Sequence, residues 1–341
     1  MNSSLRWCLC SYTGGLVIAL GACSSNSPPP SNGSSGSASG SSGGSSSGSG
    51  SSGTFDGMGM LCPTQTHVVS ATKLTMDSTW PMTLAVDPGM GKVFIVILST
   101  YDIDSQNKIT GKTKTCQSTT PAISLNAIGQ GAVGAPGPAQ VAILLPSSTW
   151  NAPTMPKFNV TGTLGGWHVG ASFAIDPVTT LAGLSPTSPF AKADAVWPMS
   201  GTQLMPSDIV DDDGDGHPGI TSIPRSASTT GMADAMYYVP KTATTGGRPT
   251  DKLYLVLRTE LSLSGTNTSC TEGSGTANVT QLNNHVVGCD VSMPPMTDCT
   301  PDEYNYIDSN TTVYSVMSGT YATKQLTGAT PTCDDAVAAF P

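Results

Sequence analysis

The chain has 341 residues, of which 38% are hydrophobic, so it contains enough apolar side chains to bury a sizeable core. Only 11% of the residues are charged, against about 25% in an average soluble domain. Three of the 23 acidic residues are Glu and the rest are Asp, which favours turns over helix interiors. The formal net charge of −9 argues against a nucleic-acid-binding protein, because such proteins need basic stripes that neutralise phosphates.

Residues 1–22 have the features of an export signal. Arg6 precedes the apolar stretch Leu16–Leu20, which is followed by the small residues Gly21 and Ala22. The stretch is much shorter than the ~20 residues that span a bilayer, and no later segment approaches that length. We therefore predict a cleaved signal peptide and no transmembrane helix.

The end of this signal carries a second feature. The residues Leu20-Gly21-Ala22-Cys23 resemble the lipobox of bacterial lipoproteins, in which a Leu and two small residues precede a modified Cys. The resemblance implies cleavage before Cys23 and acylation of that residue, which would anchor the protein in a membrane. By analogy with Gram-negative sorting, Ser24 favours the outer membrane of the cell envelope, facing the periplasm or the cell surface. An ordinary secretory signal with an incidental Cys is the alternative.

Residues 23–54 form a segment of biased composition. From Ser24 to Gly53, 24 of 30 residues are Ser or Gly and none is charged. Such a segment cannot bury apolar surface, so we predict a disordered tether between Cys23 and a folded domain at 55–341.

Nine cysteines are present, of which two precede the cleavage site and Cys23 would carry the lipid. An even number remains, which in an oxidising compartment predicts three disulfides. The six candidates are Cys62, Cys116, Cys270, Cys289, Cys299 and Cys333. Six cysteines allow fifteen pairings, and the simplest joins neighbours along the chain, as Cys62–Cys116, Cys270–Cys289 and Cys299–Cys333.

The folded part has the pattern of an all-β protein. Apolar and β-branched runs alternate with Gly, Pro and Asp-rich turns, which predicts many short antiparallel strands in a sandwich or barrel. The runs are Lys92–Leu98, Gln140–Leu145, Phe158–Leu164, Val169–Ile175, Lys252–Leu257 and Thr311–Met317. One short C-terminal helix is predicted after Thr332, because Thr332 and Asp335 have the spacing of a capping box.

Two of these runs resemble each other. Lys92–Ile97 and Lys252–Leu257 match in residue type at every position, and each is followed by a polar stretch with a Cys. The domain could therefore contain two related β units, with lobes near 55–230 and 231–341. The simpler interpretation is that buried strands look alike because β-branched and aromatic residues fill them.

An Asp-rich loop is the sharpest motif in the chain. Asp211, Asp213 and Asp215 occupy positions 1, 3 and 5 of an Asp-x-Asp-x-Asp-Gly loop, and Gly216 supplies the tight turn. Alternating carboxylates around such a turn deliver the hard oxygen ligands that Ca²⁺ prefers. The loop resembles the calcium loops of dockerins, thrombospondin type 3 repeats and FG-GAP repeats, which implies a structural Ca²⁺ held by these residues and the His217 carbonyl.

The loop also departs from these families. Position 9 is Gly219, where FG-GAP loops carry Asp, and position 12 is Ser222, where EF-hands carry a bidentate Glu. Water or a distant residue would have to complete the coordination of the ion. The alternative is an acidic surface turn stabilised by its own hydrogen bonds.

No catalytic constellation stands out. Residues 129–134 spell Gly-x-Gly-x-x-Gly, but Pro136 and Pro138 follow where a helix N-terminus would have to receive a pyrophosphate. The four His residues are scattered, without the spacing of a zinc site. We therefore assign no catalytic residue and favour a protein without enzymatic activity.

Three functions remain open. The anchor, tether and calcium loop favour a non-catalytic surface lipoprotein whose β domain binds or scaffolds a protein, a glycan or a small ligand. The alternatives are an anchored hydrolase and a carrier of small hydrophobic ligands that resembles lipocalins. A large apolar cavity would favour the carrier, whereas converging carboxylates or a Ser–His contact would favour the hydrolase. A filled interior with a flat exposed patch would favour the scaffold.

Overall fold

The structure, a computed structural model, describes residues 59–82, 88–124, 140–202, 204–226, 233–234, 237–239, 248–291, 297–310, 313–328 and 330–341. The signal peptide, Cys23 and the tether that the sequence predicts therefore lie outside the described residues. Within those ranges, no helix is both long and apolar enough to cross a membrane.

The described chain is mostly antiparallel β-sheet with few helices, as the sequence predicts. Its strands are β1 (His67–Trp80), β2 (Gly89–Ile103), β3 (Lys108–Thr119), β4 (Ile123–Ser124), β5 (Gln140–Leu145), β6 (Phe158–Leu164), β7 (Ser172–Ala182), β8 (Ile220–Ser226), β9 (Ala233–Asp234), β10 (Tyr237–Val239), β11 (Arg248–Asn267), β12 (Glu272–Val291) and β13 (Ser315–Gln325). Its helices are α1 (Ser147–Trp150), the 3-10 turn η1 (Pro206–Asp208), α2 (Pro301–Asn310) and α3 (Cys333–Ala338).

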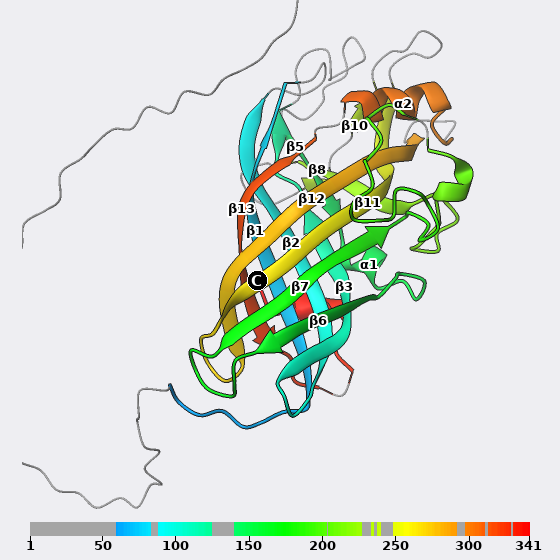
Figure 1. The fold of residues 1–341 in the computed structure, drawn as a ribbon. Helices are drawn as coiled ribbons and strands as arrows, with labels where there is room; N and C mark the ends of the chain where they lie inside the picture. Colours follow the sequence, from blue (N-terminus) through cyan, green and yellow to red (C-terminus); the bar gives the residue numbers. More distant parts are fainter. Residues whose placement is uncertain are drawn as a thin grey trace, which may run out of the picture. The chain divides into compact units, whose positions relative to one another are not determined.

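The sheet closes on itself. Its pairings run β12-β13-β1-β2-β3-β6-β7-β11, and β11 pairs in turn with β12, so eight of the described strands form a closed ring (Figure 1). Strands from 55–230 and from 231–341 pair with each other, at β1–β13 and at β7–β11, and so belong to one sheet. Closure leaves one face of every strand inside the ring.

The apolar runs form strands that are covered on both faces. On β2, Val93, Ile95 and Ile97 are buried inside the ring, while Val96 and Leu98 are buried outside, where α3 packs. A strand buried on both faces reads as a continuous apolar run rather than an alternating one. β11 is covered likewise, because the segment 183–219 packs on its outer face. This shared double burial explains why the two runs resemble each other.

The wall between β3 and β11 is built from two short strand pairs. At one end of the ring, β6 and β7 join the Lys108–Thr113 part of β3 to the Leu257–Thr266 part of β11. At the other end, β5 and β8 make the same connection, and β8 pairs with Leu253–Leu255. β11 is thus much longer than the run Lys252–Leu257 that predicted it, because it crosses both halves of the wall.

Helix α2 takes the place of a strand beside β12. β12 pairs with β13 only over Glu272–Thr276 and then diverges from it. Asp308 of α2 accepts a hydrogen bond from the backbone N–H of Val286, at 2.7 Å, and contacts the ring of His285. At the edge that β13 leaves, the Val286 N–H is therefore satisfied by a carboxylate rather than left unpaired.

All six remaining cysteines form disulfides, but the predicted neighbour pairing is wrong. The bonds join Cys62 to Cys270, Cys116 to Cys333 and Cys289 to Cys299. Ring closure is the reason, because it brings residues that are more than 200 positions apart in the sequence into contact.

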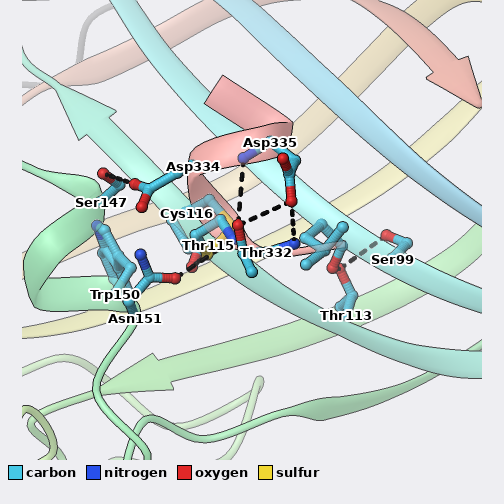
Figure 2. The surroundings of a disulfide bond; sticks show 12 residues. Ser99, Thr113, Thr115, Cys116, Ser147, Trp150, Asn151, Thr332, Asp334 and Asp335 are labelled. Carbon is cyan, nitrogen blue, oxygen red and sulfur yellow. Dashed lines mark hydrogen bonds between the residues drawn. A yellow bond between two sulfur atoms is a disulfide. The ribbon is translucent and has the colours of Figure 1, made fainter. Parts of the chain in front are cut away.

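Helix α3 is fastened to the outer face of β3 (Figure 2). The Cys116–Cys333 disulfide joins the two elements, and the Ser147 hydroxyl donates a hydrogen bond to Asp334 at 2.5 Å. The capping box predicted from Thr332 and Asp335 is present at its N-terminus. The C-terminal helix thus braces β3 from outside.

Candidate functional site

An apolar cavity lies inside the half of the ring where β5 and β8 connect β3 to β11. Its volume is about 100 Å³. Aliphatic side chains make up most of its wall, including Ile95 from β2, Ile143 from β5 and Leu255 from β11. An apolar cavity of ~150 Å³ binds benzene, so this smaller one is on the scale of a short chain or a small ring.

Small residues leave this space open. Ala182 of β7 lines the cavity at the point where β6 and β7 give way to β5 and β8, and its side chain is 3% exposed. Trp150 of α1 also lines the cavity, and its indole N–H donates a hydrogen bond to the Leu145 carbonyl at 3.2 Å. That bond ties α1 to the end of β5.

Tyr314, just before β13, borders the cavity beside Trp80. The two rings meet edge to face, with centroids 5.8 Å apart. Burial raises the pKa of Tyr314 to about 12, despite a hydrogen bond with the Thr120 side chain that opposes the shift. The phenol is therefore uncharged at neutral pH.

The Asp-rich loop is the second candidate site, and it folds as a closed turn on the outside of the ring. Ligand oxygens of Asp211, Asp213 and Asp215 lie within 4.8 Å of one another. The Gly219 N–H donates to the Val210 carbonyl at 3.0 Å, which closes the base of the turn. Gly219 has a φ of +87°, and a Cβ there would lie 2.5 Å from the Leu255 carbonyl oxygen, so only glycine fits against β11.

The carboxylates of this loop are held mainly by backbone N–H groups. Asp211 accepts from Gly214 at 2.7 Å and from Gly216 at 2.9 Å, and Asp213 accepts from Thr221 at 2.8 Å. The second oxygen of Asp213 is buried without a hydrogen-bond partner. A buried carboxylate oxygen without a donor, close to two other carboxylates, is a donor set that Ca²⁺ would satisfy.

Burial and, to a smaller extent, repulsion between carboxylates raise pKa values in the same loop. Burial, followed by smaller contributions from Asp213 and Asp211, raises the pKa of Asp212 to about 6, against a hydrogen bond from the Gly183 N–H. Burial likewise raises the pKa of Asp213. Both shifts mark a place where added positive charge would be favourable.

Stacking on a neighbouring aromatic ring positions the side chain of His217. The imidazole stacks on the ring of Tyr254 of β11, with centroids 4.4 Å apart. The backbone N–H of His217 donates a hydrogen bond to the Asp215 carboxylate at 2.9 Å. The ligand role of its carbonyl stays a prediction. Among the described residues, the group that could hold a metal consists of Asp211, Asp213 and Asp215.

A buried His–Asp pair is the arrangement closest to a catalytic dyad. His285 Nδ1 lies 2.7 Å from Asp308 and its Nε2 lies 3.1 Å from the Pro198 carbonyl oxygen. Both ring nitrogens thus face acceptors, and the Gly201 N–H also donates to Asp308. The pair fastens α2 and the segment 183–219 to β12.

Comparisons with known proteins give no family for this chain. No family model matches it, and no curated protein is significantly similar to it. The cavity was not predicted from the sequence, and neither was the role of Arg258. This buried cation of β11 donates hydrogen bonds to the carbonyl oxygens of Phe190 and Lys192. Arg258 interrupts an apolar run of the sequence, and this interruption is the feature that could have indicated its role in holding the segment 183–219.

Proposed function

We propose that the chain is a lipid-anchored protein of the cell envelope whose β domain binds a small apolar molecule inside the ring of strands. The observation that supports this proposal is the apolar cavity. Well-formed apolar cavities with a few polar groups are the usual form of small-ligand sites. The cavity favours a carrier over a scaffold with a filled interior, and the acidic loop would add a structural Ca²⁺ next to β8.

Toluene is a suitable probe for the proposed site, because it is a small, uncharged and apolar aromatic molecule. We expect it to bind the purified protein in isothermal titration calorimetry. Ala182→Leu should abolish binding by filling the cavity, at little cost in stability since the added methyl groups enter empty space. Ala322→Leu makes the same change on an exposed part of β13 and should leave binding intact. Equal binding to both variants would overturn the proposal.

The anchor is tested separately. The proposal rests here on the lipobox-like residues Leu20–Cys23 and on the uncharged segment that follows them. Growth with a labelled fatty acid should mark the wild-type protein but not Cys23→Ser, and the labelled protein should fractionate with outer membranes. Labelling of both proteins alike would contradict lipidation at Cys23.

A further inference from the structure

The cavity has a chemical character beyond being apolar. Among the described residues that line it, none is Lys, Arg, His, Asp or Glu. An ionised group that enters such a space loses its hydration and finds no opposite charge among the described residues, which disfavours its binding. The wall therefore discriminates against carboxylates and ammonium groups.

Polar groups nevertheless reach the cavity from several strands. Thr115 and Ser118 lie on β3, Thr259 on β11 and Asn284 on β12, and all four line the space. None of these side chains makes a hydrogen bond to a described residue. They differ in this from the neighbouring Thr120, whose hydroxyl accepts a hydrogen bond from the Ile143 N–H at 2.8 Å.

Of these four side chains, Asn284 can make the most hydrogen bonds. Its amide offers two donor hydrogens and one acceptor oxygen. The adjacent Asn283 points to the outer face of the sheet and accepts hydrogen bonds from Arg258. Asn284 is paired across the sheet with Leu257, which lines the cavity. Its amide is thus free to hydrogen-bond a group that occupies the space.

We propose that the cavity selects uncharged apolar molecules that carry one hydrogen-bonding group, such as an alcohol or a carbonyl compound, and that Asn284 binds that group. This inference rests on the proposed function of the cavity. A neutral hydroxyl can both donate to and accept from the Asn284 amide, which compensates for the water it leaves. Acids and amines of the same size have no partner for their charge.

Four ligands that share one aromatic ring and have similar sizes test the inference at pH 8 by titration calorimetry: toluene, benzyl alcohol, benzoate and benzylammonium. We expect benzyl alcohol to bind at least tenfold more tightly than either ion. Asn284→Leu keeps the shape of the side chain. It should weaken the binding of benzyl alcohol at least fivefold and leave the affinity for toluene unchanged or higher. Asn159→Leu, at an exposed position of β6, should change neither affinity.

The outcomes separate the two proposals. If none of the four ligands binds the wild-type protein, the proposed function fails and this inference fails with it. If toluene binds but benzoate binds as tightly as benzyl alcohol, only the selectivity is wrong. If Asn284→Leu weakens the binding of toluene and of benzyl alcohol equally, Asn284 shapes the cavity wall without contacting the polar group of the ligand. That result would overturn the assignment of Asn284 as the residue that binds this group.

Discussion

At the scale of single residues, Arg258 shows how one buried cation fixes a long segment. Its side chain is 1% exposed and donates hydrogen bonds to the carbonyl oxygens of Phe190, Lys192 and Ala195, at 2.7–2.8 Å. It also lies over the Trp197 ring, 5.0 Å from the centroid. The planar guanidinium suits this many acceptors in a way that a lysine cannot. The segment 183–219, which carries the Asp-rich loop, is thereby held against β11.

Calcium should stabilise the protein through that loop. We expect millimolar Ca²⁺ to raise the melting temperature, because the ion would satisfy the free oxygen of Asp213 and offset repulsion among the carboxylates. An affinity of ~10⁻⁴–10⁻³ M is typical of extracellular modules. At ten times the dissociation constant, the gain is about 1.4 kcal/mol, or roughly 3–6 °C. Differential scanning calorimetry with Ca²⁺ or a chelator measures this shift.

The matched variants decide where calcium acts. Asp213→Ala with Asp215→Ala should remove the shift, whereas Asp77→Ala with Asp102→Ala removes the same charge from β1 and β2 and should keep it. A wild-type melting temperature that does not respond to calcium would identify the loop as an acidic turn.

At the scale of elements, the disulfides differ in how much chain they constrain. Cys116–Cys333 joins residues 217 positions apart, while Cys289–Cys299 spans 10. On the chain-entropy model, removing the first should cost about 5 kcal/mol of unfolding free energy and removing the second about 3. Urea unfolding of Cys116→Ala with Cys333→Ala, compared with Cys289→Ala with Cys299→Ala, measures both losses. Equal losses would show that local packing, not loop length, sets their contribution.

The strands were predictable because their cause is local. The bounds of β5 and β6 agree with the apolar runs that predicted them, and α3 begins where Thr332 and Asp335 form their capping box. The disulfide pairing was not predictable, because it depends on which strands close the ring. Cys62 meets Cys270 in the turn between β11 and β12, and nothing near either residue in the sequence encodes that contact.

The cavity escaped prediction for a related reason. An empty space is the result of several side chains that fail to meet, and each of them looks ordinary in its own strand. Ser118 and Asn284 read as residues on a solvated face, because a polar position in a strand usually faces water. Their inward direction follows from the register of β3 against β2 and of β12 against β11, both of which contain irregularities near these positions.

At the scale of the whole molecule, several charged groups of the described residues lie on the outer face of the ring, away from the apolar cavity. The acidic loop and the His285–Asp308 pair lie on the outer face of β11 and β12, and lysines such as Lys73 and Lys92 lie on the outer face of β1 and β2. Among the described residues that line the cavity, the titratable one is Tyr314, and burial raises its pKa to about 12. The described wall of the cavity therefore keeps the same charge across the physiological range.

Binding and stability should consequently respond to pH in different ranges. We expect the affinity for benzyl alcohol to stay constant from about pH 5 to pH 9, because none of the described residues that line the cavity changes its charge there. Titration calorimetry across this range measures the affinity.

The stability of the folded protein should fall at higher pH. The folded-state pKa of Tyr314 lies above its ordinary value of 10.0, so the folded protein holds this proton more tightly than the unfolded chain, and its contribution is lost between pH 10 and pH 12. Burial raises the pKa of Tyr321 to about 12 as well, which adds to the same decline. Urea unfolding at several pH values measures the decline, and Tyr314→Phe should make it shallower. A decline of the same slope in Tyr314→Phe would show that alkaline unfolding arises elsewhere in the molecule.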